Sequence, residues 1–182
     1  MKVIGIDPGS RICGYGILEA GDNRSVKHLT SGCISASPTL SIDKRLHKIY
    51  TELSKVIQKF SPDIMSIENV FFSRNAKSAI RLGEARGIAL LAAADCGIAV
   101  FEYAPTQVKL ALTGRGRANK QEVQRIVGAI FDIQHFEKHD VSDAIAMALC
   151  HIHIKEVEKK WGTEILRSRR RRVRFSLDDI AS

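Results

Sequence analysis

The sequence predicts an α/β protein in which one five-stranded mixed sheet is flanked by helices. In the first third of the chain, three strand-like runs are separated by short turn sequences, which is typical of antiparallel strands. Two further short strands then alternate with segments of helical periodicity, which is typical of parallel β–α units. Because the last third of the chain is helical, its helices are expected to cover this sheet.

The first three strands are each bounded by turn residues. The first strand, Lys2 to Asp7, is mostly apolar and delivers one carboxylate into the turn at Pro8 and Gly9. The second and third strands are expected at 12–19 and 25–34, and the Gly-Asp-Asn sequence at 21–23 is typical of a hairpin turn.

A helix and a fourth strand follow the antiparallel part. Apolar residues recur at helical spacing from Leu46 to Phe60, between a start signal at Ser37 and Pro38 and a stop signal at Ser61 and Pro62. The fourth strand, Asp63 to Glu68, is apolar and again ends in a carboxylate. The remaining elements are expected to be an Ala-rich helix at about 75–96, a short strand at 98–103, two helices on either side of 114–117, and a last helix at about 139–160.

Length and charge predict one basic domain. The 182 residues suffice for a single hydrophobic core, which we expect at 1–160. The segment 161–182 is expected to be a basic tail, disordered when free, because it holds six arginines between Arg167 and Arg174 without apolar periodicity. The 28 Lys and Arg residues against 20 Asp and Glu give a net charge of +8, which favours a polyanionic partner.

Cysteine usage and hydropathy predict a cytoplasmic location. The four cysteines are widely separated and lack C-x-x-C spacing, which favours free thiols in a reducing compartment. The N-terminus leads directly into a strand pattern, and no apolar stretch is long enough to cross a bilayer. We therefore expect no membrane partner.

Four acidic residues form a candidate metal site. Asp7 and Glu68 end separate strands, and Asp140 and Asp143 stand three apart at the start of the last helix, so they project from one helix face. Taken singly, Glu68 could lie on a solvated face, and the helical pair could serve as N-terminal capping residues. Together they could hold two hard divalent cations, which would relieve the repulsion among them and hydrolyse a phosphodiester.

Several segments, read in order, resemble the RuvC family of Holliday-junction resolvases over about residues 1–155. The matching segments are Gly5–Ser10, Gly14–Gly16, Ile67–Phe71, Leu82–Gly87, Glu102–Tyr103, Gln107–Lys109 and Asp140–Ala144. The resemblance implies a ribonuclease H-like fold, a homodimer, and a divalent metal, Mg²⁺ with two ions per protomer, for which Mn²⁺ can substitute. It also implies the RuvAB branch-migration complex as a partner.

The resemblance assigns four carboxylates to metal binding and catalysis, namely Asp7, Glu68, Asp140 and Asp143. Some relatives have a histidine at the first position of the late pair, and here His139 directly precedes Asp140. Adjacent helix positions point about a quarter-turn apart, so the two cannot be equivalent ligands. The three-residue step to Asp143 favours Asp140, which leaves His139 as a proton shuttle or a group that supports the ligands.

The resemblance also assigns three residues to DNA. Phe71 matches an aromatic residue that contacts bases near the crossover, and Lys109 and Lys120 match basic residues that face the cleaved strand. These assignments agree with the ability of an aromatic ring to stack on a base and of lysine to neutralise a phosphate. Without the resemblance, the same residues are read as a core phenylalanine and two solvated lysines.

The implied function is metal-dependent, structure-selective cleavage of four-way DNA junctions in recombination and repair. A dimer would nick two symmetric strands and leave 5′-phosphate and 3′-hydroxyl ends. Three alternatives stay open. Gly5–Gly9 also resembles the first phosphate loop of actin-like and sugar-kinase ATPases, although the chain is short for two lobes. A scaffold of the same fold that only binds, or a nuclease of the pre-ribosomal RNA-processing branch, would share the remaining features.

Overall fold

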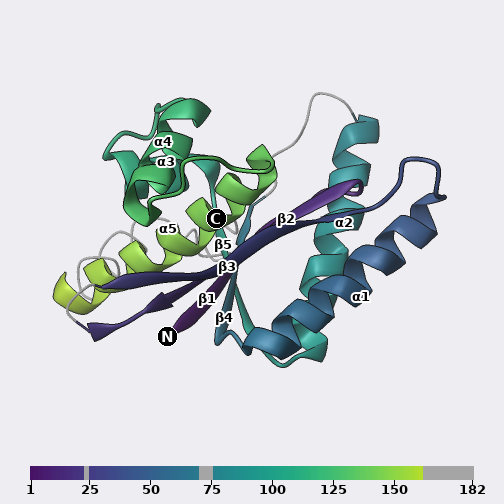
Figure 1. Ribbon diagram of the computed structural model, residues 1–182, viewed down its shortest axis with the longest axis horizontal. Coiled ribbons are helices and arrows are strands. Elements are labelled where there is room, and N and C mark those ends of the chain that lie inside the picture. The colour runs from purple at the N-terminus through teal and green to yellow at the C-terminus, as the bar shows by residue number, and fades with distance from the viewer. Residues whose placement is uncertain (23–24, 70–75, 162–182) are drawn as a thin grey trace, which may run out of the picture.

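The computed structural model describes residues 1–22, 25–69 and 76–161 (Figure 1). The strands are β1 (Lys2–Asp7), β2 (Ile12–Ala20), β3 (Val26–Ser35), β4 (Ile64–Glu68) and β5 (Ala99–Tyr103). The helices in this part of the chain are α1 (Ile42–Phe60), α2 (Ala76–Asp95), α3 (Pro105–Thr113), α4 (Lys120–Phe131) and α5 (His139–Trp161). Their order and type agree with the sequence predictions.

The start of α1 is the largest difference from the predicted element boundaries. The start signal placed it just after Pro38, whereas the helix begins at Ile42. The backbone N–H of Leu40 donates to the Ser37 carbonyl oxygen at 3.1 Å, and the Ser37 and Thr39 hydroxyls lie 2.7 Å apart. The serine and threonine side chains therefore stabilise a turn here, before the helix starts.

The five strands form one mixed sheet in the order β3-β2-β1-β4-β5. The pairs β1–β2 and β2–β3 are antiparallel, whereas β4 pairs in parallel with both β1 and β5. The predicted five-stranded mixed sheet is thus confirmed. Because β1 and β4 are parallel neighbours, their carboxyl ends lie at the same edge of the sheet.

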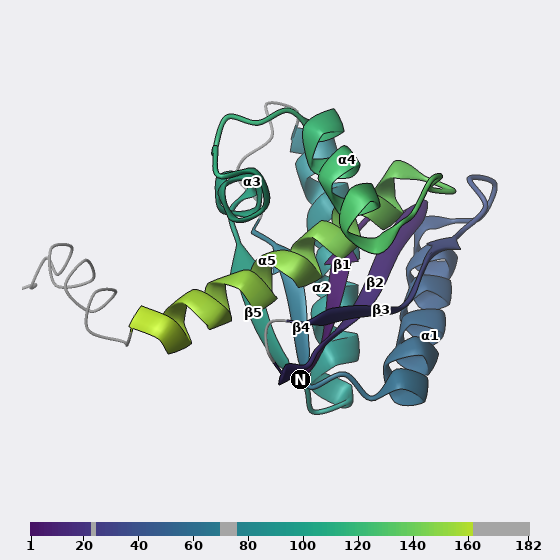
Figure 2. The same ribbon diagram turned by 60° about the vertical axis from the view of Figure 1, so that its left-hand side comes forward.

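Helices cover both faces of the sheet (Figures 1 and 2). On one face, α1 and α2 bury Ile4 and Ile6 of β1 together with Met65 and Ile67 of β4. On the other face, α5 packs on the sheet and carries α3 and α4 on its outer side, in a second core cluster that includes Val3. Alternation of side chains along the strands therefore separates two cores.

Glycines allow α5 to lie unusually close to the sheet. A Cβ atom added at Gly5 would come 1.9 Å from the main-chain oxygen of Ala144, and one at Gly14 would come 2.1 Å from that of Asp140. The Ser66 hydroxyl of β4 donates a hydrogen bond of 2.7 Å to the Met147 carbonyl oxygen. These contacts fix the start of α5 over the ends of β1 and β4.

All four cysteines are free, but only Cys13 and Cys150 are buried, whereas Cys33 and Cys96 are partly exposed. Among the described residues, none of the helices combines the length and apolar character that a membrane span requires.

Candidate active site

The two strand-end carboxylates face α5 from neighbouring strands. Asp7 is the last residue of β1 and Glu68 is the last residue of β4. Side chains alternate along a strand, so Asp7 shares a face with Val3, which packs in the α5 cluster. Likewise, Glu68 shares a face with Ser66, whose hydroxyl bonds to α5. Parallel pairing places both carboxylates at one edge.

The other two acids come from the first turns of α5. A pocket of about 270 Å³ at this edge is lined by the side chains of Asp7, Glu68, Asp143, Lys109 and Lys120, with apolar residues of α3, α4 and α5. Asp140 does not line this pocket. Asp140 lies one helical turn before Asp143, and its negative charge raises the pKa of Asp7.

The electrostatics of Asp7 show that the acids act on one another. The pKa of Asp7 is raised from 3.8 to about 7, first by burial and then by the charges of Asp143, Asp140 and Glu68, whereas Lys120 lowers it. A carboxyl group whose ionisation is opposed by both burial and like charges requires a cation to stay charged at neutral pH.

The pKa of Glu68 is raised by the same kinds of interaction. Burial raises its pKa, Asp143 adds to the increase, and Lys120 and Lys109 lower it. The Lys120 ammonium forms an ion pair with the Asp143 carboxylate and so lies among the acids. These two lysines are the cations that the pocket itself supplies.

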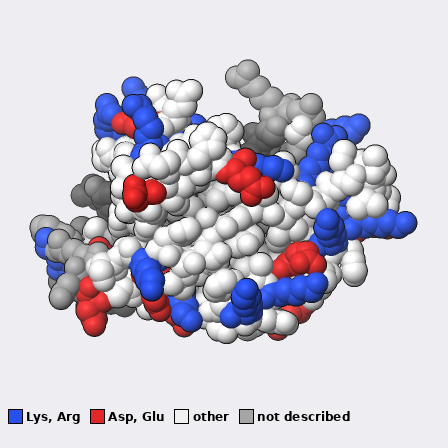
Figure 3. Space-filling view, in the orientation of Figure 1, with Lys and Arg blue, Asp and Glu red and all other residues white. Residues whose placement is uncertain are grey.

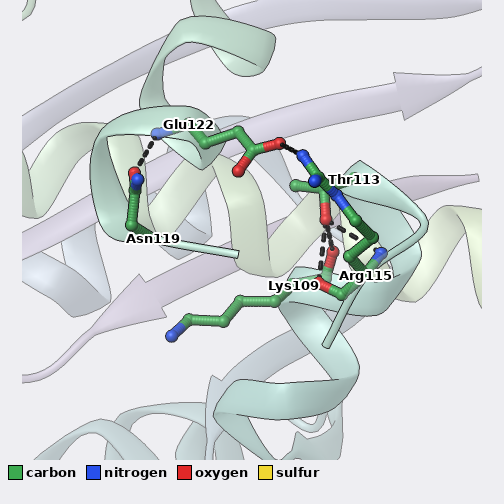
Figure 4. Close-up of polar contacts among 5 residues, drawn as sticks. All are labelled: Lys109, Thr113, Arg115, Asn119 and Glu122. Carbon is green, nitrogen blue, oxygen red and sulfur yellow. Dashed lines mark hydrogen bonds and ion pairs between the residues drawn. The ribbon is translucent and has the colours of Figure 1, made fainter. Parts of the chain in front are cut away.

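The α3–α4 hairpin carries both lysines, and Figure 4 shows the contacts around Lys109. The Thr113 hydroxyl lies 2.8 Å from the Lys109 carbonyl oxygen and accepts a hydrogen bond of 3.1 Å from the Arg115 backbone N–H. Arg115 forms an ion pair with Glu122, and the Asn119 side chain caps α4 by accepting from the Glu122 backbone N–H at 2.8 Å. The space-filling view shows Lys and Arg side chains gathered over this hairpin (Figure 3).

The donor set fits a hard divalent cation. All four candidate ligands are carboxylates, which Mg²⁺ and Mn²⁺ prefer. The pKa of Asp7 is raised first by burial and then by the neighbouring acids, whose negative charge a cation would compensate. In the present side-chain positions, the described residues contain no group of three His, Cys, Asp or Glu side chains close enough to hold one ion. Lys120 instead neutralises Asp143, so ion binding would require the lysine and carboxylates to rearrange.

The raised pKa of Asp7 predicts how the metal-free protein responds to pH. Its folded-state pKa lies above the ordinary 3.8, so the folded state is favoured while Asp7 is protonated and loses stability as the pH rises from about 4 to 7. In EDTA at pH 8, Asp7→Asn should therefore be more stable than the wild type by a few kcal/mol, since each pKa unit corresponds to about 1.4 kcal/mol.

Urea unfolding at pH 5 and pH 8 measures this effect. The gain should shrink at pH 5, and Asp22→Asn, in the turn at the opposite end of the sheet, should change stability at neither pH. Equal stability of the wild type and Asp7→Asn at pH 8 would contradict the electrostatic account.

His139 lies apart from the acidic pocket. Its side chain is exposed and lines a different hollow with α4 and the segment that precedes α5. Its carbonyl oxygen accepts a 2.7 Å hydrogen bond from the Ser142 hydroxyl. Of the sequence-predicted site residues, Phe71 lies outside the described residues.

The sequence analysis assigned no role to Arg86 of α2, although Arg86 contacts the main chain of Glu68 from the other face of the sheet. Its Nη2 atom lies 2.5 Å from the Glu102 carboxylate, and its Nε atom donates to the Glu68 carbonyl oxygen at 3.4 Å. Helical periodicity could not have found this residue, because both partners come from strands distant in sequence.

Comparisons with known proteins agree with the site and the fold. The family model of "Crossover junction endodeoxyribonuclease RuvC" matches residues 3–151. RuvC from Trichlorobacter lovleyi is 42% identical over 170 residues, which cover 93% of this chain and 95% of the relative. RuvC from Geobacter sulfurreducens is 47% identical over 151 residues, which cover 83% of this chain and 92% of the relative.

Solved structures give the same result. Thermus thermophilus RuvC in complex with a Holliday junction substrate has a TM-score of 0.80 and 32% identity, covering 86% of this chain and 96% of that one. The yeast mitochondrial Holliday junction resolvase Ydc2, at 13% identity, has a TM-score of 0.64 with 87% and 82% coverage, which bears on the fold alone. The predicted ribonuclease H-like fold is confirmed. The chain therefore belongs to the RuvC family of crossover junction endodeoxyribonucleases.

Proposed function

We propose that this protein resolves four-way DNA junctions as a metal-dependent, structure-selective endonuclease. The observation that carries the proposal is the pocket in which the carboxylates of β1, β4 and α5 meet Lys109 and Lys120. The family membership and the junction complex of the Thermus relative support the same substrate. Paired nicks in two symmetric strands would leave 5′-phosphate and 3′-hydroxyl ends that can be ligated.

Each charged group in or beside the pocket has a defined task. We assign metal binding to Asp7, Glu68, Asp140 and Asp143. Mg²⁺, as two ions per protomer or replaced by Mn²⁺, would activate water and stabilise the leaving oxygen when bound. Lys109 and Lys120 would hold the phosphates of the cleaved strand, and Lys120 would exchange Asp143 for a phosphate as the DNA enters. We further propose that Phe71 stacks on a base near the crossover.

A cleavage assay on matched substrates tests the proposal. The protein is incubated with a synthetic four-way junction, a linear duplex of the same sequence and an RNA hairpin, each with Mg²⁺, with Mn²⁺ or with EDTA. We expect metal-dependent, symmetric nicks in the junction alone. Cleavage of the RNA hairpin in preference to the junction would favour the RNA-processing alternative, and junction binding without cleavage in any metal would favour a binding-only scaffold.

We propose that two copies associate through the outer face of α2. The small residues Ala85, Ala89, Ala92 and Ala93 of this Ala-rich helix are not available for such a contact, because all four are buried inside the protomer. The opposite face is available. Ile80 and Leu91 are 63% and 49% exposed, and open space surrounds the Cα atoms of Gly83 and Gly87 between them. These four residues share one helical stripe, because their spacing follows the helical period.

The cellular setting also remains a proposal. A junction nuclease of this family acts where chromosomal DNA is found, so we propose a cytoplasmic location. We also propose the RuvAB branch-migration complex as a partner. We further divide the chain into a nuclease domain at 1–160 and a basic tail at 161–182, which lies almost entirely outside the described residues.

The tail should add DNA affinity that does not depend on junction shape. Each phosphate that its arginines neutralise should steepen the salt dependence of binding by about 0.9 in log units. Deleting residues from Trp161 onward should therefore weaken junction and linear-duplex binding alike and flatten the salt slope, while cleavage at saturating junction survives. Fluorescence titrations at several salt concentrations measure this. Lost junction selectivity with an unchanged slope would instead indicate a specific role.

The position of His139 predicts a supporting role at most. Since this side chain lies outside the acidic pocket, His139→Ala should slow junction cleavage without eliminating it. Single-turnover rates at saturating metal measure the change, and circular dichroism verifies folding. A folded but inactive His139→Ala protein would show that the late ligand is His139 and that Asp140 has been assigned wrongly.

A further inference from the structure

We propose that Arg86 is a positioning residue that fixes the end of β4, and thereby Glu68, from the face of the sheet opposite the active site. The proposal rests on the function proposed above, in which Glu68 is a metal ligand. It gives α2, whose outer face is proposed to form the dimer contact, a direct connection to the catalytic edge.

Two contacts hold the last peptide of β4 against its neighbours. The Asn69 backbone N–H donates to the Tyr103 carbonyl oxygen of β5 at 2.9 Å, and Arg86 Nε donates to the Glu68 carbonyl oxygen at 3.4 Å. The ion pair between Arg86 and Glu102 connects the same guanidinium to β5. Arg86 thus joins the ends of two adjacent parallel strands to one helix.

The two faces of the sheet separate this contact from the chemistry. Ile67 packs in the α1–α2 core, and its register partner on β5 is Glu102, so Glu102 and Arg86 meet on that face. The Glu68 carboxylate points to the α5 face, since side chains alternate along a strand. Arg86 therefore reaches Glu68 through its main-chain oxygen and leaves the carboxylate free to bind metal.

The environment of Arg86 argues against a role in holding DNA. Its side chain is only 18% exposed, and its guanidinium is neutralised by Glu102 at 2.5 Å. The pocket is lined by Lys109 and Lys120 and not by Arg86. Arginine suits the observed role because its planar fork can bind a carboxylate and a carbonyl oxygen at the same time, which an ammonium group does less well.

The first test measures the position of the β4 end without using activity. In Arg86→Gln, hydrogen exchange of the Asn69 amide should become faster, because the last peptide of β4 loses one of its two contacts, while exchange in β1 stays unchanged. Arg81→Gln is the matched control. It removes the same charge from the same helix, and its ion pair with Glu84 at 3.0 Å stays within α2.

The second test separates positioning from binding. At saturating junction, Arg86→Gln should lower kcat by about 10- to 100-fold, the cost of misplacing a catalytic group by a fraction of an ångström to about 1 Å. Junction affinity measured in Ca²⁺ and the oligomeric state should not change, Arg86→Lys should recover part of kcat, and Arg81→Gln should match the wild type.

The outcomes judge the inference and the proposed function separately. Unchanged Asn69 exchange in Arg86→Gln overturns the inference whatever the protein cleaves, and so does a loss of junction affinity with unchanged kcat. If the wild type cleaves no junction, the proposed function fails, and the exchange result still decides the role of Arg86. Should Arg86→Gln fail to fold, Glu102→Gln at the 42% exposed partner serves instead, with the same changes expected to a smaller degree.

Discussion

Asp7→Asn should abolish junction cleavage while leaving junction binding intact. Asp7 is the partly buried acid whose pKa is raised by all three other acids, so its replacement should remove the proposed metal ligand at the centre of the site. We expect the cleavage rate to fall by about a thousandfold or more, which corresponds to about 4 kcal/mol of lost transition-state stabilisation. Binding should tighten slightly, because a negative charge is removed from a surface that faces phosphates.

Gel-shift and single-turnover cleavage measurements on one synthetic junction separate the two effects. Glu68→Gln, Asp140→Asn and Asp143→Asn should behave in the same way. Asp22→Asn is the control, since it removes an exposed acid at the far end of the sheet. Cleavage by Asp7→Asn at nearly the wild-type rate would refute the assignment of metal binding to this pocket.

Much of the fold could be predicted because local patterns and topology agree. The carboxylates at the ends of two apolar strands predicted a shared edge, and the parallel pairing of β1 and β4 produces that edge. The glycines of β1 and β2, in contrast, did not predict how closely α5 packs on the sheet. Gly5 and Gly14 are required by the helix backbone beside them, a long-range contact that no local pattern reports.

The site was less predictable than the fold. Spacing brought Asp140 and Asp143 to one helix face, but it could not show that only Asp143 lines the pocket or that Lys120 forms an ion pair with it. Such differences depend on how α3 and α4 pack on α5. The role inferred for Arg86 likewise depends on two strands that meet only in the folded chain.

Helix α2 shows why composition alone cannot locate a dimer surface. Small residues occur on both of its faces, so an Ala-rich sequence does not distinguish a face that packs on the sheet from one that meets a second copy. Burial makes the distinction, since Ala89 and Ala92 are fully buried whereas Ile80 and Leu91 are largely exposed. The sequence therefore predicted the helix correctly, but only the tertiary structure shows which of its two faces packs on the sheet and which is exposed.

The exposed stripe of α2 leads to the second prediction of large effect. The double variant Ile80→Glu/Leu91→Glu should be monomeric at micromolar concentration, because four like charges would face one another across a two-fold contact and no apolar surface would remain there to bury. Both side chains are exposed in the protomer, so the variant should fold normally. Paired incision should then be lost, because the two nicks require two active sites on one junction.

Sedimentation and a plasmid-borne cruciform assay measure both results, since a paired cut linearises the plasmid and a single nick only relaxes it. Val157→Glu is the matched control, because it places a charge at an equally exposed apolar residue of α5, and it should remain dimeric and linearise the cruciform. A double variant that stays dimeric would place the interface elsewhere. A monomer that still linearises the plasmid at the wild-type rate would show that paired incision does not require the dimer.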